Sequence, residues 1–573
     1  MTIPFLRRAA VVAAAAVAVV GVAAAPASAA PAAAATTTVR LIGLNDFHGN
    51  LQPPTGSSGR VVQSDGTTVD AGGAAYVATH VKALKAAASG SLVLSGGDNI
   101  GASPLPSALF HDEPTIEFLN AIGTSASAVG NHELDEGYRE LGRVQLGGCH
   151  PTDGCQFHDP YRGAKFPFLA ANMTFENSGL PAALPFTVKI VNGVPIGIIG
   201  ATLKGLPEIV SAAGIKGLRF GDEAAAINKS SALLQRLGIR TQVVVIHQGD
   251  STVGANGPND CNLATQGPLS AINAGVSPNV DVIISGHSHT QYNCQLPDPS
   301  GTPRTVIQSL SFGRLLSVID LAVDKRTRDV VRPATTATNV IVTRTVTPDP
   351  AVQGLVDEAV TKSAPIANRP IGSITGDIVR AAAPSGESPL GNAIADSQLA
   401  ATTGAGAQIA LMNPGGVRAD LTYASSPVGE GAGVVTYGEA FTVQPFGNIL
   451  QTLTYTGAQL DAVLEQQWQP QADGSTIVRI LQPSSTLHYT QTPTNPVGDR
   501  VSDITVNGVP VDPAATYRVT VNNFLSGGGD GFTVLTQGTD VTGGPIDLDA
   551  FTAYLTANPG LAPPATDRIT VAG

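Results

Sequence analysis

The chain has 573 residues, of which 43% are hydrophobic and 13% are charged, and its formal charge is −12. This length and hydrophobic content allow packed cores and favour two or three domains over one. The acidic balance argues against a stable nucleic-acid partner, because proteins that bind the phosphate backbone usually carry a basic face.

Residues 1–29 have the features of a secretory signal peptide. Arg7 and Arg8 precede an apolar run of alanine and valine, which ends at the small-residue sequence A-S-A at 27–29. An uncleaved membrane anchor is the alternative, but Pro26 interrupts the apolar stretch, which is short for a membrane span. We expect a secreted or extracytoplasmic protein with no transmembrane segment after signal removal. Cell-wall association and oligomeric state are left open.

The apolar run at 38–44 predicts a buried strand, and Asp46 and His48 follow it directly. If the extended geometry persists, side chains two positions apart point to the same face, so both would converge beyond the carboxyl end of the strand. Open α/β sheets bind their ligands at that end. For this pair taken alone, an ordinary solvated loop is the alternative.

Similar strand-then-loop units recur through about residue 325 and alternate with alanine-rich helical stretches. The apolar runs are SLVLS at 91–95, VPIGIIGAT at 194–202, TQVVVIH at 241–247 and VDVIIS at 280–285. Five of the ten histidines fall at or near the ends of such units, together with carboxylates and one amide. The residues concerned are Asp46, His48, Asp98, Asn131, His132, His247, His287 and His289.

Four cysteines, Cys149, Cys155, Cys261 and Cys294, allow three pairings. The first two would close a short turn-rich loop, and the last two would clamp the segment that carries the GHSH string. Because no CxxC pair is present, structural disulfides are favoured over a zinc or thioredoxin-like site, and the pairing stays open.

The sequence pattern changes at residues 331–365. This segment predicts an edge strand, a proline-containing turn and a helix that connect two domains. A second α/β pattern fills residues 366–573. Here Ser388 and Pro389 are typical of an N-cap and a first helical position, and they predict a helix through about residue 401. An anion could dock at the N-terminus of this helix. The alternative, given equal weight, is a well-capped surface helix with no ligand. The string VNGVP, at 191 and again at 506, predicts two hairpin turns.

Imidazoles, carboxylates and an amide oxygen suit divalent transition metals such as zinc or manganese. Seven ligands are too many for one tetrahedral ion and about the number that two ions need when they share a carboxylate, for which Asp98 is the natural choice. Two such ions can activate a hydroxide and stabilise an in-line displacement at phosphorus. The implied chemistry is phosphoester hydrolysis.

The ordered strings D-x-H, GGDN, GNHE and GHSH, with His247 between the last two, resemble the calcineurin-like metallophosphoesterase superfamily. Within it, LNDFHGN and VGNHELDEG resemble the bacterial and extracellular 5′-nucleotidase family. The resemblance implies an α/β (α+β) fold, with a two-sheet sandwich flanked by helices over residues 37–330. The connector at 331–365 would then lead into a C-terminal α/β nucleotide-binding domain over residues 366–573.

The resemblance also assigns roles to single residues. The first metal would be held by Asp46, His48, Asp98 and His289, and the second by Asp98, Asn131, His247 and His287. His132 and Asp135 match the catalytic dyad of the family. Some nucleotidases of this family carry an amide at the position of His289, and the imidazole here favours zinc or manganese over magnesium.

Three later strings, MNPGGVR, QPFGN and NFLSGGGDGF, resemble the nucleotide-binding domain of 5′-nucleotidases. By that resemblance Phe446 and Phe524 sandwich the base, Asp530 binds the ribose hydroxyls, and Asn413 and Arg418 lie near the phosphate. Ring stacking tolerates different bases, so a broad-specificity enzyme is expected.

One departure from the family concerns the loop before Ser388, where close relatives carry arginine and this chain has the sequence P-S-G at 384–386. Arg380 is the nearest candidate to replace it. A lost guanidinium fork would weaken the grip on a terminal phosphate and shift preference towards diesters or cyclic nucleotides.

The sequence therefore predicts an exported two-metal phosphohydrolase that converts nucleotides, its small-molecule substrates, to nucleosides and phosphate. Alternatives on the same scaffold are a 2′,3′-cyclic-nucleotide phosphodiesterase/3′-nucleotidase, a UDP-sugar hydrolase and an extracellular nuclease. The non-enzyme alternative is a secreted binding protein or adhesin. The presence of every expected metal ligand argues against it. Structural or surface roles are expected for His80, His111, His150, His158, His488 and Trp468.

Overall fold

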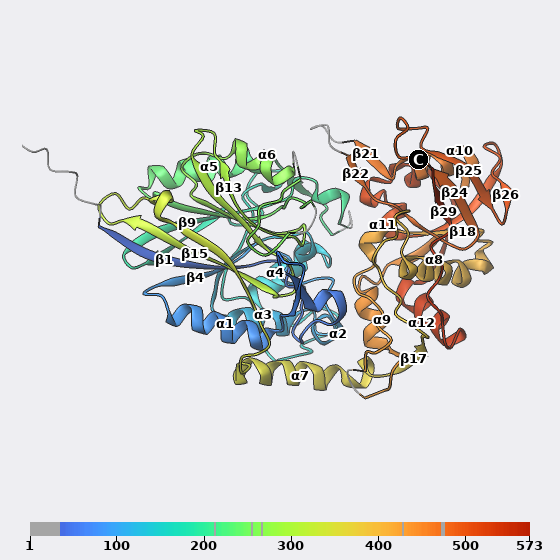
Figure 1. Cartoon of the computed structure of the whole chain (residues 1–573), viewed down its shortest axis with the longest axis horizontal. Coiled ribbons are helices and arrows are strands. Elements are labelled where there is room, and N and C mark those ends of the chain that lie inside the picture. Colours follow the sequence, from blue (N-terminus) through green and yellow to red (C-terminus); the bar gives the residue numbers. More distant parts are fainter. Residues whose placement is uncertain are drawn as a thin grey trace, which may run out of the picture.

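The computed structural model describes residues 35–210, 214–253, 256–264, 267–426, 429–470 and 476–572. The predicted signal peptide at 1–29 lies outside these residues. Two lobes stand side by side, and the long helix α7 (Pro350–Ala367) runs below the first lobe towards the second (Figure 1). In the part of the chain that is described, no helix is both long and apolar enough to cross a membrane.

The first lobe is built on two six-stranded sheets. One has the order β16 (Thr336–Ile341), β15 (Leu315–Asp324), β1 (Thr36–Leu44), β4 (Ser91–Ser95), β5 (Thr124–Ala128) and β6 (Phe168–Leu169). The other has the order β13 (Gln291–Pro297), β14 (Pro303–Ser309), β12 (Val282–Ser285), β11 (Thr241–His247), β9 (Val194–Thr202) and β8 (Phe186–Val191). In both sheets the central strands are parallel, so their carboxyl ends share an edge.

The two sheets pack face to face on a shared core, which includes Leu41, Leu94, Val243 and Ile284. All seven residues of β11 are buried, which explains its continuous apolar run. Fully burying one such aliphatic side chain stabilises the fold by about 1.5 to 3 kcal/mol. The predicted two-sheet sandwich is confirmed.

Helices cover the outer faces of the sandwich. The outer core of the first sheet includes side chains of α1 (Ala74–Ala86), α3 (Glu113–Ile122) and α4 (Tyr138–Leu146). On the second sheet that place is taken by α5 (Glu223–Arg236) and α6 (Pro268–Gly275). The alternation of strands and helices thus produces four layers.

The segment predicted to connect the domains packs with the first lobe. β16 is the edge strand beside β15, and α7 packs against α1, α2 (Leu105–Ala108) and α3. Asp349 caps α7, since its carboxylate accepts the N–H groups of Ala351 and Val352. The edge strand, turn and helix lie where the sequence predicted them, and the domain boundaries at 330 and 366 stay predictions.

The second lobe contains a five-stranded and a four-stranded sheet. The first has the order β23 (Gln482–Pro483), β18 (Ile409–Met412), β27 (Thr516–Asn522), β20 (Ile449–Thr456) and β28 (Thr539–Ile546). The second has the order β26 (Val509–Pro510), β25 (Val501–Val506), β24 (Leu487–Gln491) and β29 (Ile569–Val571). Its longer helices are α8 (Pro389–Thr402), α9 (Tyr437–Val443), α10 (Gly457–Glu465) and α12 (Asp547–Ala557).

Helix α8 begins and ends close to where the sequence predicted. The Ser388 hydroxyl accepts the N–H of Gly391 at 3.0 Å, which confirms the N-cap. The idea of a surface helix is wrong, because most of α8 is buried against α12 and the sheet. Its N-terminus is covered by Gln482, whose Oε1 accepts the Ser388 N–H at 2.6 Å.

Smaller elements complete the described chain. The two-stranded antiparallel sheets pair β2 (Arg60–Val62) with β3 (Thr68–Asp70), β7 (Met173–Phe175) with β10 (Leu218–Phe220), β17 (Pro370–Ser373) with β19 (Val434–Thr436), and β21 (Trp468–Pro470) with β22 (Thr476–Val478). Both VNGVP strings form the predicted hairpin turns, and their Asn-Gly residues all have φ between 51° and 75°. The disulfides are Cys149–Cys155 and Cys261–Cys294.

Candidate metal centre and substrate cleft

The loops that follow the parallel strands of both sheets meet at one edge of the sandwich and bring the seven predicted ligands together. Two groups of carboxylate and imidazole atoms form there, each with its atoms within 4.8 Å of one another. One group is Asp46, His48 and His289, and the other is Asp98, His247 and His287. We call these six residues and Asn131 the ligand cluster.

Asp98 lies between the two groups. Its Oδ2 is 3.0 Å from His247 Nε2 and 3.6 Å from His48 Nε2. Asn131 completes one group, because its Oδ1 lies 3.1 Å from His247 Nε2 and 3.1 Å from His287 Nδ1. This arrangement matches two ligand sets that share one carboxylate.

The donor set fits divalent cations. The Nδ1 atoms of His48 and His247 donate to the carbonyl oxygens of Gly101 and Gly96, at 2.8 and 2.9 Å. When these rings are neutral, each Nε2 presents a lone pair to the cluster, and His48 Nε2 lies 3.1 Å from His289 Nε2. Such converging acceptors repel one another unless a positive charge lies between them. Backbone carbonyls that fix the outer ring nitrogen are typical of metal-binding histidines.

In three of the four histidines of the cluster, the pKa shifts favour the neutral ring. Burial lowers the pKa of His48 and of His289, and it lowers the pKa of His287 to about 3, so these rings are neutral, as metal ligands must be. Burial also opposes a proton on His247, but the Asp98 carboxylate outweighs it and raises that pKa to about 9. The carboxylate thus attracts positive charge, which a metal ion would supply.

The backbone of the ligand cluster is unusual. Five of its seven residues have a left-handed backbone, with φ between 45° and 73°: Asp46, His48, Asp98, His287 and His289. Non-glycine residues adopt this conformation rarely and at a cost of about 1 kcal/mol or more each, mostly at functional sites. The predicted extension of β1 is therefore wrong. The strand ends at Leu44, and the turn beyond it, not strand alternation, brings Asp46 and His48 together.

Surrounding hydrogen bonds hold these turns. The carboxylate of Glu133 accepts the N–H groups of Asp98, Asn99 and Gly130 at 2.6 to 2.8 Å. Burial, and then the Asp98 charge, raise the pKa of Glu133 to about 7. This positioning role was not predicted, although Glu133 lies inside the GNHE string. Gly130 is also required, since a Cβ there would lie 2.1 Å from Asp98 Oδ1.

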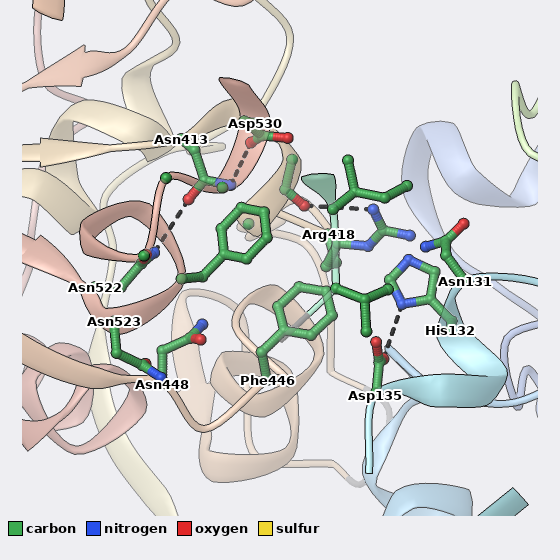
Figure 2. A pocket seen from close by; sticks show the side chains of 18 of the residues that line it. Asn131, His132, Asp135, Asn413, Arg418, Phe446, Asn448, Asn522, Asn523 and Asp530 are labelled. Atoms are coloured by element: carbon green, nitrogen blue, oxygen red, sulfur yellow. Dashed lines mark hydrogen bonds and ion pairs between the residues drawn. The ribbon is translucent and has the colours of Figure 1, made fainter. Parts of the chain in front are cut away.

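The predicted dyad is formed. His132 Nδ1 lies 2.8 Å from Asp135 Oδ2, and the carboxylate orients the ring (Figure 2). Burial lowers the pKa of His132, but Asp135 and Asp98 outweigh it and the net shift is upward. The backbone N–H of His132 donates to Asp98 Oδ1 at 2.9 Å, which ties the dyad to the ligand cluster.

A cleft of about 610 Å³ lies between the lobes, and we call it the dyad cleft. From the first lobe it is lined by Asn131, His132, Asp135 and His287, and from the second by all five predicted substrate residues, Asn413, Arg418, Phe446, Phe524 and Asp530. The rings of Phe446 and His132 stack with centroids 5.7 Å apart. The Arg418 guanidinium lies 5.8 Å from the Phe446 centroid (Figure 2). The dyad and the predicted nucleotide-binding residues therefore share one cleft.

Asp530 is held at the far side of this cleft. Its Oδ2 accepts the amide of Asn413 at 2.9 Å, and its Oδ1 lies 3.6 Å from Arg479 Nε. Burial raises the pKa of Asp530. Arg479 lines the cleft and was not predicted. Arg380 does not line it, but borders a separate cavity of about 400 Å³.

The residues expected to have structural roles lie elsewhere. Trp468 is 5% exposed in the core of the second lobe. His158 pairs with Glu117 and Glu358. His80 hydrogen-bonds a backbone carbonyl, and His488 is exposed on β24. A further group, which we call the peripheral cluster, has two stacked histidine rings beside two carboxylates and consists of His111, Glu136, His150 and Asp153.

Comparison with known sequences finds two matches along the chain. Residues 39–291 match the calcineurin-like phosphoesterase family, and residues 370–537 match the 5′-nucleotidase C-terminal domain. Cell wall protein Lmo0130 of Listeria monocytogenes is 33% identical over 549 residues, which cover 91% of this chain and 67% of that protein. Endonuclease YhcR of Bacillus subtilis is 30% identical over 90% of this chain, which spans only 39% of that longer protein.

Among solved structures, the 5′-nucleotidase precursor from Thermus thermophilus superposes with a TM-score of 0.76 at 27% identity. The match covers 93% of this chain and 99% of that one, so both lobes and their arrangement have a counterpart.

Proposed function

The chain belongs to the 5′-nucleotidase family, with a calcineurin-like phosphoesterase domain followed by a 5′-nucleotidase C-terminal domain, and from this membership we propose that it is a metal-dependent phosphoester hydrolase converting nucleotides to nucleosides and phosphate. The observation that carries the proposal is the dyad cleft, because one cavity is lined by His132 and Asp135 from one lobe and by the predicted nucleotide-binding residues of the other. Export to the cell exterior is part of the proposal and rests on residues 1–29.

The cofactors would be two divalent ions, with zinc or manganese favoured by the four imidazoles of the ligand cluster. Asp46, His48, Asp98 and His289 would hold one ion, and Asp98, Asn131, His247 and His287 the other. Ions bound there would lower the pKa of a bound water and stabilise negative charge on the phosphoryl oxygens.

The protein side chains would bind and orient the substrate. Phe446 and Phe524 would hold the base between them, and Asp530 would accept hydrogen bonds from the ribose hydroxyls. The Arg418 guanidinium would neutralise the phosphate. His132, oriented by Asp135, would donate a hydrogen bond to a phosphoryl oxygen or to the leaving ribose oxygen.

The test is hydrolysis of AMP, ATP, UDP-glucose and 2′,3′-cyclic AMP by the purified protein, loaded with zinc or manganese. Phosphate release is measured together with chromatography of the nucleotide products, because cleavage of one ester bond of a diester frees no inorganic phosphate. We expect metal-dependent turnover of AMP, which Asp98→Asn abolishes and the matched change Asp153→Asn in the peripheral cluster leaves intact. Turnover of only the cyclic or sugar nucleotide would assign the centre to diesters. A folded, metal-loaded protein that hydrolyses none of the four would contradict the proposal.

A further inference from the structure

A second cleft, of about 460 Å³, also lies between the lobes, and we call it the α7 cleft because α7 forms part of its wall. Its lining includes Asn50, Gln52, Pro104 and Phe312 from the first lobe and Thr442 from the second. Among the residues that the structure describes, Arg418 is the one that lines both clefts.

The α7 cleft comes close to the ligand cluster, because its lining residue Phe312 contacts two of the cluster's histidine rings. The Phe312 ring lies 5.9 Å from the ring of His48 and 5.5 Å from that of His289, centroid to centroid. Gly49, which directly follows His48, also lines the cleft. The dyad cleft instead reaches the cluster at His287 and Asn131. The two clefts thus approach different members of one cluster and meet at Arg418.

The lining of the α7 cleft suits a neutral group. Four prolines, at 53, 54, 104 and 106, and Phe312 supply much of its surface. Apart from Arg418, the charged side chains there already have partners, and Asp420 accepts the backbone N–H of Arg380 at 2.9 Å. Arg344 donates to the carbonyl oxygens of Pro54 and Ala71, both at 2.6 Å. Glu439 accepts the backbone N–H of Thr436 at 2.8 Å. The volume falls within the usual range of small-molecule sites, about 300 to 1,000 Å³.

We propose that the α7 cleft binds the second ester group of a nucleoside 5′-phosphodiester, whose first nucleoside lies in the dyad cleft. A monoester carries one organic group on phosphorus and fills one cleft, whereas a diester carries two. In the reaction the oxygen of water bonds to phosphorus, the bond from phosphorus to the second alcohol oxygen breaks, and that oxygen takes a proton. The products are a nucleoside 5′-monophosphate and an alcohol. The inference rests on the proposed function of the same centre.

The charge near the phosphate is consistent with a diester. Arginine is absent from positions 384–386, and Arg380 borders a separate cavity, so Arg418 is the arginine that both clefts share. A diester phosphate carries one negative charge, whereas a terminal phosphate carries close to two at neutral pH, so the diester requires less compensation.

The test compares thymidine 5′-phosphate p-nitrophenyl ester with thymidine 5′-monophosphate. Gln52→Trp and Thr442→Trp would each fill the α7 cleft, from opposite lobes, and Leu233→Trp on the exposed face of α5 is the matched control. We expect the wild type to release p-nitrophenol. Each cleft variant should lower the ratio of kcat/KM for the diester to that for the monoester about tenfold, which corresponds to about 1.4 kcal/mol, and the control should preserve that ratio.

The outcomes separate the inference from the proposed function. Hydrolysis of the monoester alone, or an unchanged ratio in both folded cleft variants, would overturn the inference and leave the nucleotidase proposal standing. The α7 cleft would then be a gap between the lobes. Hydrolysis of neither compound by metal-loaded wild type would remove both proposals.

Discussion

The first lobe contains two groups of histidines and carboxylates, and they differ in the geometry of their rings. In the ligand cluster, the facing pairs His48–His289 and His247–His287 are tilted by 60° and 67°, with centroids 5.0 and 5.1 Å apart. In the peripheral cluster, His111 and His150 are stacked at 17° and 3.9 Å. Tilted rings can direct their lone pairs to one point, whereas stacked rings direct them along parallel lines.

The two clusters also differ in where their protons lie. In the ligand cluster, the outer nitrogens of His48 and His247 donate to backbone carbonyls. In the peripheral cluster, both nitrogens of His111 face carboxylates, Glu136 at 3.0 Å and Asp153 at 2.8 Å. The hydrogen bond to Glu136 is the main cause that raises the pKa of His111 to about 9. In the ligand cluster these two outer protons thus face neutral carbonyl oxygens, whereas in the peripheral cluster the His111 ring lies between two carboxylates.

The largest effect is expected from a change to Asp98, the carboxylate that lies between the two groups of the ligand cluster. Asp98→Asn removes the carboxylate shared by both ligand sets, and we expect bound metal and kcat to fall by more than about 100-fold. Metal content by mass spectrometry and phosphate release from AMP measure both. Asp153→Asn is the matched change in the peripheral cluster, and a comparable loss of metal there would show that the two clusters are not distinct.

A smaller effect is expected for Glu133→Gln, which weakens the acceptor for the N–H groups of Asp98 and Gly130. Changes to residues that orient metal ligands typically cost about 10- to 100-fold in metal affinity. Isothermal titration with zinc measures that affinity. Glu117→Gln, which removes a carboxylate beside His158, serves as the control. Equal zinc affinity in Glu133→Gln and wild type would exclude the positioning role.

The smallest effect concerns pH and the peripheral cluster. Because folding raises the pKa of His111 from about 6.5 to about 9, its ion pairs stabilise the fold fully below pH 6.5 and lose that contribution as the pH rises through 9. We expect about 1 to 2 kcal/mol, reduced by the half-exposed carboxylates. Denaturant unfolding at pH 6.5 and 9.5 should show this loss in wild type and a flatter dependence in His111→Asn. Parallel curves would contradict the ion-pair assignment.

Much of this architecture can be predicted from local sequence. Buried strands reveal themselves as apolar runs, Ser388 and Pro389 mark the start of α8, and Asn-Gly pairs mark both hairpins. The strings D-x-H and GNHE locate residues of the ligand cluster, because metal binding restricts the residue types. The left-handed turns are not predictable in the same way, since aspartate and histidine do not by themselves encode that backbone.

Other features depend on contacts distant in sequence. His111 meets Asp153 only because the Cys149–Cys155 loop folds back towards α3. The α7 cleft joins residues near position 50 with residues near 440, and no local pattern links these segments. The role of Glu133 was hidden for another reason, because accepting backbone N–H groups requires no characteristic spacing.

The chain passes between the lobes once, between the end of α7 at Ala367 and the start of β17 at Pro370. All predicted metal ligands and the dyad precede this crossing, and all five predicted substrate residues follow it. Under the proposed assignments, catalysis and nucleoside recognition are encoded in two consecutive stretches of the gene. A recombination event at one short junction would then exchange the nucleoside-binding residues, while the metal ligands and the dyad are inherited unchanged.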